Sequence, residues 1–246
     1  GLSWQRVTLN RGLFPTDGSS TALSLSATIP GSDINYYRLN LRQRFYQPLS
    51  SELVFGFQGE IGYLDAYGDT EQTPFFQNFY AGGPRSLRGF ESNTLGPRST
   101  DAPCYEFNYE EGTCPNLVDT DGDGVADEPY YNPYANNTSR YRDAPIGGNI
   151  KIEGSMQLIF KLPFIEDQRS MRSAFFFDFG NVFSDNCKDY QINCYKPSIE
   201  DLRYSYGVGV TWITGFGPMS FAISQPTNAG PQERTEEFQF TVGNVF

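Results

Sequence analysis

The sequence contains no histidine, and only four of its 246 residues are cysteine. The chain therefore lacks the side chain that most often works as a general acid or base near neutral pH. It also has neither the convergent Ser and Asp arrangement of a nucleophilic enzyme nor a glycine-rich nucleotide loop. From these absences we expect no enzymatic catalysis.

Long apolar runs and positive charge are scarce as well. A transmembrane helix needs about 18 consecutive apolar residues, whereas the nearest stretch, 156–164, is interrupted by Lys161 and Pro163. A mean hydropathy of −0.47 is also too polar for a helical membrane protein. With 18 Lys and Arg against 29 Asp and Glu, the net charge is −11. We therefore expect no nucleic-acid partner, because nucleic-acid binding depends on basic residues that neutralise phosphates.

The four cysteines form two close pairs in polar, turn-rich segments, Cys104 with Cys114 and Cys187 with Cys194. Such pairs predict two local disulfides and an oxidising compartment. A zinc site is the alternative, but the spacings C-x₉-C and C-x₆-C are poor for zinc and no histidine is available.

Short segments in which apolar and polar residues alternate are abundant. At the end of the chain, Phe238, Phe240, Val242 and Phe246 fall on one face of an extended strand, because side chains alternate with period two. The same test predicts about nine strands, at residues 3–9, 21–29, 36–46, 51–64, 149–162, 171–183, 203–213, 218–225 and 237–246.

Two features favour a membrane barrel over a soluble sandwich. In 171–183, three phenylalanines share one face, while Phe176, Asp178 and Gly180 share the other. An Asp among so many aromatic residues is costly unless its face is wet or paired. Residues 65–146 contain no convincing strand, which is unusual in a compact domain but typical of extracellular barrel loops. We therefore expect an all-β, antiparallel transmembrane β-barrel whose long loop lies outside or folds into the lumen.

Two motifs add a resemblance to a known family. The long loop contains Leu87-Arg88-Gly89-Phe90, and the later strand contains the residues 176–180, Phe-Phe-Asp-Phe-Gly. The first resembles the (V/I)RGF loop signature of the BamA family of outer-membrane protein assembly factors, and the second resembles the F-x-D-x-G strand motif of that family. The likeness extends to residues 11–18, 75–80, 217–218 and 225–226, and so covers nearly the whole chain.

The resemblance implies a barrel of sixteen strands, of which this chain, residues 1–246, holds the C-terminal part with about nine strands and without the periplasmic POTRA domains. The chain starts with Gly1 and no signal peptide, which fits a mature or shortened protein. The family arginine corresponds to Arg88, and its partners on the barrel wall correspond to Phe176, Asp178 and Gly180. An Arg and carboxylate pair away from bulk water is strong and directional. We therefore expect Arg88 and Asp178 to hold the loop in the lumen.

A second carboxylate contact to Arg88 is expected from the same strand in the family. Gln157 stands where relatives often have a lumen-facing Glu, so Glu153, on the same face, is the candidate substitute.

The function implied by the resemblance is assembly and insertion of β-barrel proteins into the bacterial outer membrane. The terminal strand resembles the β-signal and, in the family, pairs weakly with the first strand, so that a seam can open and add a substrate strand. Implied partners are unfolded outer-membrane proteins, the lipid bilayer and Bam lipoproteins, the last through the periplasmic domains. The shortened barrel is expected to self-associate or to close in a non-native way. The alternatives are a TamA-like or two-partner secretion translocation barrel, and a passive porin.

An acidic segment in the long loop gives a separate hypothesis. Its acidic side chains stand at positions one, three, five and nine of a calcium-loop pattern, with Gly124 at position six; they are Asp119, Asp121, Asp123 and Asp127. Position twelve is Tyr130 instead of the usual bidentate Glu. A calcium site and a solvated acidic turn both remain open, and no other cofactor is expected.

Overall fold

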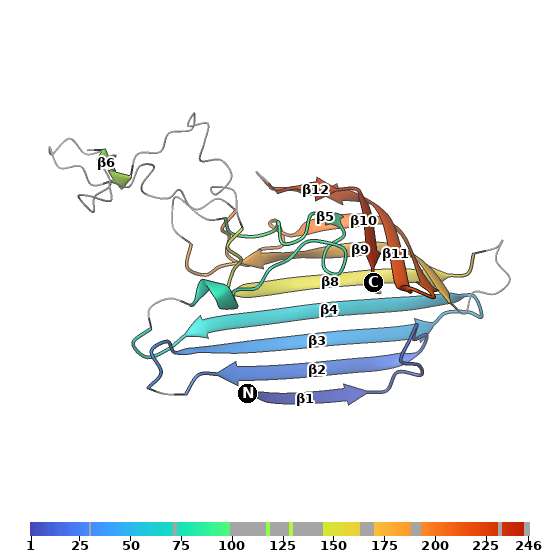
Figure 1. Ribbon diagram of the computed structural model, residues 1–246, viewed down its shortest axis with the longest axis horizontal. Helices are drawn as coiled ribbons and strands as arrows, with labels where there is room; N and C mark the ends of the chain where they lie inside the picture. Colours follow the sequence, from blue (N-terminus) through green and yellow to red (C-terminus); the bar gives the residue numbers. More distant parts are fainter. Residues whose placement is uncertain are drawn as a thin grey trace.

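The computed structural model describes residues 1–29, 31–70, 73–98, 117–118, 128–129, 145–162, 170–187, 193–230 and 233–243. Its main feature is one antiparallel sheet of nine strands, in the spatial order β1-β2-β3-β4-β8-β9-β10-β11-β13 (Figure 1). The strands are β1 (Leu2–Val7), β2 (Gly18–Ala27), β3 (Tyr36–Pro48), β4 (Leu53–Ala66), β8 (Ile150–Phe160), β9 (Met171–Phe183), β10 (Arg203–Thr214), β11 (Gly217–Thr227) and β13 (Phe238–Val242). Each corresponds to one alternating segment of the sequence, which confirms the predicted all-β, antiparallel fold.

The remaining elements are short. The 3-10 helix η1 (Phe75–Gln77) follows β4, and β5 (Gly89–Phe90) pairs with β12 (Thr235–Glu236). β6 (Leu117–Val118) pairs with β7 (Glu128–Pro129). Among the described residues, no helix has the length and apolar character needed to cross a bilayer.

One face of the sheet carries a continuous apolar surface. Strand register places a row of apolar side chains across six neighbouring strands, formed by Phe55, Leu158, Phe175, Val208, Ile223 and Phe238. Phe175, Ile223 and Phe238 are among the exposed large hydrophobic residues of this face. An exposed apolar band of this extent is typical of the lipid-facing side of a membrane barrel.

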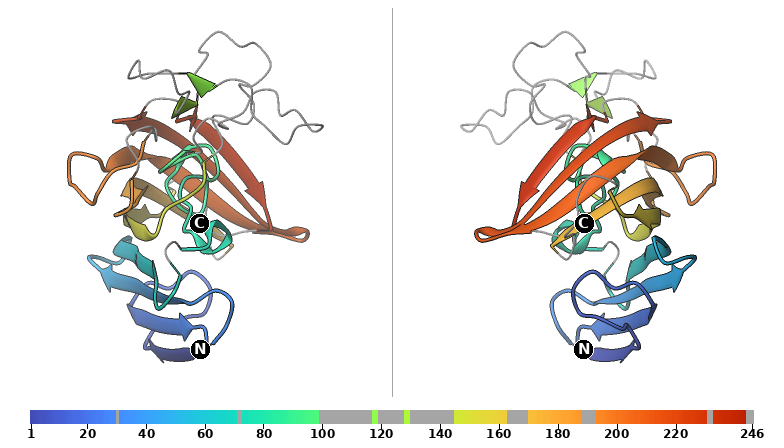
Figure 2. Two further views of the ribbon diagram at one scale, coloured as in Figure 1. Left: turned by 90° about the vertical axis from the view of Figure 1, so that its left-hand side faces the viewer. Right: turned by 90° about the vertical axis from the view of Figure 1, so that its right-hand side faces the viewer.

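The opposite face is polar and concave. Seen along the strands, the sheet curls, and the segment 79–98 lies inside the curl beside the strands β8 to β13 (Figure 2). The buried apolar cluster sits between this segment and the sheet, and its members are Leu64, Phe79, Ala81, Leu87, Phe90, Leu95 and Val182. Five of the seven come from the segment. Segment 79–98 therefore supplies most of this cluster and lies on the lumen side of the sheet.

The two outermost strands have one neighbour each in the described part of the chain. β1 pairs with β2 at six positions, and β13 pairs with β11 at five. By comparison, β10 and β11 pair at 11 positions. The described part of the terminal strand therefore has a shorter ladder than β10 and β11 have with each other.

Candidate functional site

The candidate site is the contact between the loop motif (residues 87–90) and the inner face of the sheet. Arg88 donates from Nε to Asp178 Oδ2 and from Nη2 to Asp178 Oδ1, both at 2.7 Å. The Arg88 backbone N–H donates to Oδ2 of the same carboxylate at 3.2 Å. The Arg88 side chain is 5% exposed and that of Asp178 is 0% exposed. The contact expected from the sequence is thus present as a buried, bidentate ion pair.

The neighbouring strands are shaped around the Arg88 guanidinium. Its central carbon lies 3.4 Å from the centre of the Phe176 ring, so the cation stacks on the aromatic face. On β10, a Cβ at Gly207 would lie 2.9 Å from Phe176 Cζ, and one at Gly209 would lie 3.7 Å from Arg88 Nη1. Gly207 therefore leaves space for the Phe176 ring, whereas a Cβ at Gly209 would be in ordinary contact with the guanidinium.

Arg88 also bonds a hydroxyl group on β8. Arg88 Nη2 donates to Ser155 Oγ at 3.0 Å, and Gln157 Nε2 lies 3.4 Å from the same oxygen. Glu153, the predicted substitute, instead accepts a hydrogen bond from Ser86 Oγ at 2.8 Å and pairs with Lys151 at 2.9 Å. The reason is register, because Ser155 lies directly opposite Asp178 whereas Glu153 lies opposite Gly180. Glu153 therefore holds the loop at a different point.

Gly180, the last residue of the strand motif, serves the sheet itself. A Cβ at this position would lie 2.6 Å from the carbonyl oxygen of Ile152 on the neighbouring strand. Any other residue would force the two backbones apart. Its place in the motif is explained by this close approach of β8 and β9.

The next two residues of the loop motif contact the terminal strand. Gly89 and Phe90 form β5, which pairs with Thr235 and Glu236 just before β13. Gly89 has a φ of +86°, which favours glycine, and a Cβ there would lie 3.1 Å from Ser224 Oγ. Gln239 of β13, which the sequence analysis did not single out, reaches the same backbone: its Nε2 donates to the Phe90 carbonyl at 2.8 Å.

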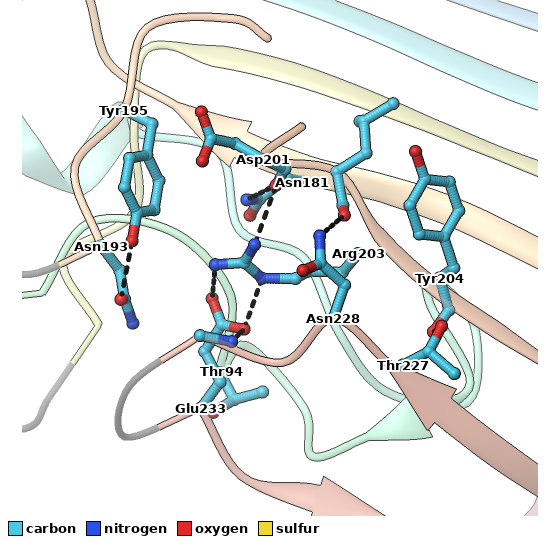
Figure 3. A network of polar contacts seen from close by, with 12 residues as sticks. Thr94, Asn181, Asn193, Tyr195, Asp201, Arg203, Tyr204, Thr227, Asn228 and Glu233 are labelled. Carbon is cyan, nitrogen blue, oxygen red and sulfur yellow. Dashed lines mark hydrogen bonds and ion pairs between the residues drawn. The ribbon is translucent and has the colours of Figure 1, made fainter. Parts of the chain in front are cut away.

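A second buried ion pair fastens the connection between β11 and β13 (Figure 3). Arg203, the first residue of β10, donates from Nε and Nη2 to the two carboxylate oxygens of Glu233 at 2.6 and 3.1 Å. Both side chains are buried. Asn228 of the same connection donates to the carbonyls of Glu200 and Leu202. In the sequence, Arg203 and Glu233 are single charged residues near strand ends. The alternation pattern therefore does not predict that they pair.

The Figure 3 network also reaches the segment 79–98 and the loop before β10. Thr94 Oγ1 accepts from the Arg234 backbone N–H at 3.0 Å. Tyr195 donates from its hydroxyl to Asn193, and Arg203 lies 5.7 Å from the Tyr195 ring centre. The segment 79–98, the loop before β10 and the connection between β11 and β13 are therefore joined at one end of the sheet.

Of the two predicted disulfides, the one between Cys187 and Cys194 is present. Cys104, Cys114 and Phe246 lie outside the described residues, as do the candidate calcium ligands Asp119, Asp121, Asp123 and Asp127. In the part of the chain that the structure describes, no group of His, Cys, Asp and Glu is placed to hold a metal ion. The calcium hypothesis therefore stays a prediction.

Comparisons with known proteins agree on one family. A family model described as the Omp85 superfamily domain matches residues 1–246. The chain is 30% identical over 261 residues to the outer membrane protein assembly factor BamA of Neisseria meningitidis serogroup B, a match covering 100% of this chain and 28% of that protein. It is 24% identical to the sorting and assembly machinery component 50 homolog of Mus musculus, covering 84% of this chain and 36% of that protein.

A solved structure shows the same fold. The crystal structure of BamA from Haemophilus ducreyi lacking POTRA domains 1-3 matches with a TM-score of 0.73 and 31% identity, covering 98% of this chain and 41% of that chain. The chain thus spans less than half the length of each of these relatives.

Proposed function

This chain belongs to the Omp85 superfamily, and from that premise we propose that it is part of a barrel in the bacterial outer membrane that assembles and inserts other β-barrel proteins. The relatives named BamA and sorting and assembly machinery component 50 support this choice over the other functions of a barrel. The proposed partners are unfolded outer-membrane proteins and the lipid bilayer, with lipoproteins bound through domains outside this chain.

The observation that carries the proposal is the contrast between a firmly held loop and a lightly held terminal strand. Arg88 and Asp178 fix the loop motif to the wall through a buried ion pair. Within the described residues, β13 pairs with β11 at five positions, compared with 11 between β10 and β11. A strand edge is a template for pairing with another chain. Release of β13 would therefore expose a template edge on a wall that stays in place.

No covalent chemistry is proposed. Insertion would proceed by pairing of a substrate strand with the exposed edge, and the free energy would come from folding of the substrate. The apolar face of the sheet keeps this edge at the level of the bilayer, where unpaired backbone groups are costly. In this proposal the backbone of a substrate strand forms hydrogen bonds with the exposed edge before the strand leaves water for the bilayer.

The test uses the full-length protein reconstituted in liposomes and an unfolded eight-stranded barrel as substrate, a size at the small end of known barrels. We expect the protein to accelerate substrate folding and Arg88→Glu to abolish the acceleration. Arg85→Glu is the matched control, because Arg85 is exposed in the same loop. Equal acceleration by the Arg88→Glu and Arg85→Glu variants would contradict a role for the ion pair between the loop motif and Asp178.

The rival functions give different results in the same liposomes. A translocation barrel of the TamA or two-partner secretion kind would carry a polypeptide into the lumen of the vesicle without inserting a barrel. A passive porin would release a small trapped dye without any substrate protein. Either result, with no acceleration of barrel folding by the parent protein, would replace the proposed function.

A further inference from the structure

The side chain of Gln239 joins the terminal strand to the loop motif by hydrogen bonds outside the sheet ladder. Its Nε2 donates to the Phe90 carbonyl at 2.8 Å and to Glu236 Oε2 at 3.2 Å. Its Oε1 accepts from the Gly89 backbone N–H at 3.3 Å. The residue is 1% exposed. One amide therefore satisfies both a donor and an acceptor on the loop backbone.

Adjacent residues of the loop motif thus bind two different parts of the wall. Arg88 binds Asp178 on β9 and Ser155 on β8. Gly89 and Phe90 bind Gln239 on β13, and Gly89 packs near Ser224 on β11. The motif spans the inner face from β8 to the terminal strand. Any movement of residues 89–90 away from the wall must break the Gln239 contacts.

We propose that Gln239 is a positioning residue through which the loop motif controls the release of the terminal strand. If β13 leaves β11 while the loop stays, Gly89 and Phe90 lose their partners in a buried environment, where unpaired polar groups are costly. If the loop withdraws, Gln239 loses its contacts with Gly89 and Phe90 and keeps the one with Glu236 Oε2. Opening of the strand and displacement of the loop are therefore coupled, and each favours the other.

The segment that leads into β13 reinforces this coupling. Glu91 donates its backbone N–H to the Arg234 carbonyl at 2.9 Å, and the Arg234 backbone N–H donates to Thr94 Oγ1 at 3.0 Å. These contacts continue the pairing between β5 and β12 away from the sheet. The loop thus holds the terminal strand at Gln239 and also holds the residues before it.

The inference rests on the proposed function for its role in a seam, but its test needs no substrate. Hydrogen exchange of backbone amides is measured by mass spectrometry on the full-length protein in lipid vesicles. The variant is Gln239→Met, which keeps the length of the side chain and removes its donor and acceptor. The matched control is Gln43→Met, since Gln43 on β3 also bonds a neighbouring strand through its amide, by accepting from Thr21.

In Gln239→Met we expect exchange to rise by about tenfold or more both in β13 and in residues 79–98, with β3 and β4 unchanged. In Gln43→Met we expect no change at either place. A rise in β13 alone would overturn the coupling, and a rise across the whole sheet would show general destabilisation and overturn it too. Should Gln239→Met not fold, Asp178→Asn tests the reverse direction: faster exchange in β13 supports the coupling and parent-like exchange there refutes it. Insertion activity is not measured in this experiment. The coupling through Gln239 and the proposed insertion function can therefore fail independently of each other.

Discussion

Replacing Arg88 by methionine tests the ion pair that holds the loop motif. The change keeps an unbranched side chain but removes the guanidinium, and it leaves the fully buried Asp178 carboxylate without its bidentate partner. Removing one member of a buried ion pair costs about 3–5 kcal/mol, because the remaining charged group stays desolvated. The free energy of opening the segment 79–98 should therefore fall by about 3 kcal/mol.

A double variant separates loss of the pair from loss of packing. In Arg88→Met with Asp178→Leu, no charge is left unpaired, and replacing a buried pair by apolar residues is often close to neutral. We expect the double variant to lose less free energy than Arg88→Met alone. Arg42→Met is the control for an exposed pair, since Arg42 is 62% exposed in its contact with Glu60. It should cost no more than about 1 kcal/mol.

The assay is hydrogen exchange of the amides in residues 79–98 in the folded full-length protein. A loss of 3 kcal/mol corresponds to roughly a hundredfold faster exchange, since each 1.4 kcal/mol is a factor of about ten. Exchange in Arg88→Met equal to that of the parent would refute the reasoning. It would also fail if the double variant exchanged as fast as the single one, because the cost would then come from lost packing.

Three further substitutions test other parts of the structure. Gly89→Ala should lower the free energy of opening the loop motif, measured by proteolysis, by about 1–2 kcal/mol, because alanine is strained at positive φ. Gly217→Ala is the control, since Gly217 also has a positive φ but lies in open space. An equal effect of both variants on the loop would contradict this prediction. Arg203→Met should leave the buried Glu233 carboxylate without its cation and make protease cleavage after Asn228 about tenfold faster, which corresponds to about 1.4 kcal/mol. Unchanged cleavage would contradict this. Phe175→Arg should cost about 2–4 kcal/mol of folding free energy in vesicles, and an unchanged urea midpoint would show that this face does not meet lipid.

The strands were predictable because their signal is local. Alternation with period two requires only neighbouring residues, and all nine alternating segments became strands of the sheet. The ion pair of Asp178 was also predictable, since an acidic residue among aromatic neighbours needs a partner, and the resemblance of the loop motif to the family signature indicated the arginine. The disulfide between Cys187 and Cys194 follows from close spacing in the same way.

The remaining contacts depend on strand register and on loop paths, which the sequence pattern does not contain. Glu153 and Ser155 lie on the same face of one strand, yet only register decides that Ser155 is the residue opposite Asp178. Gln239 is one of several polar residues on the inner face of the last strand, and its partner lies 149 positions away at Phe90. Arg203 and Glu233 are 30 positions apart and meet only because the connection after β11 turns back.

The two sequence motifs and the glycines of β10 act as one structural unit. Asp178 binds the edge of the Arg88 guanidinium while Phe176, two residues earlier on the same face, covers its plane. That arrangement needs space on the next strand: a Cβ at Gly207 would lie 2.9 Å from Phe176 Cζ, and Gly209 faces Arg88 without a side chain. A strand with Phe and Asp at this spacing, but with larger inward residues beside it, would therefore not bind the arginine in the same way. The loop signature, the strand motif and the paired glycines together define this site better than either motif alone.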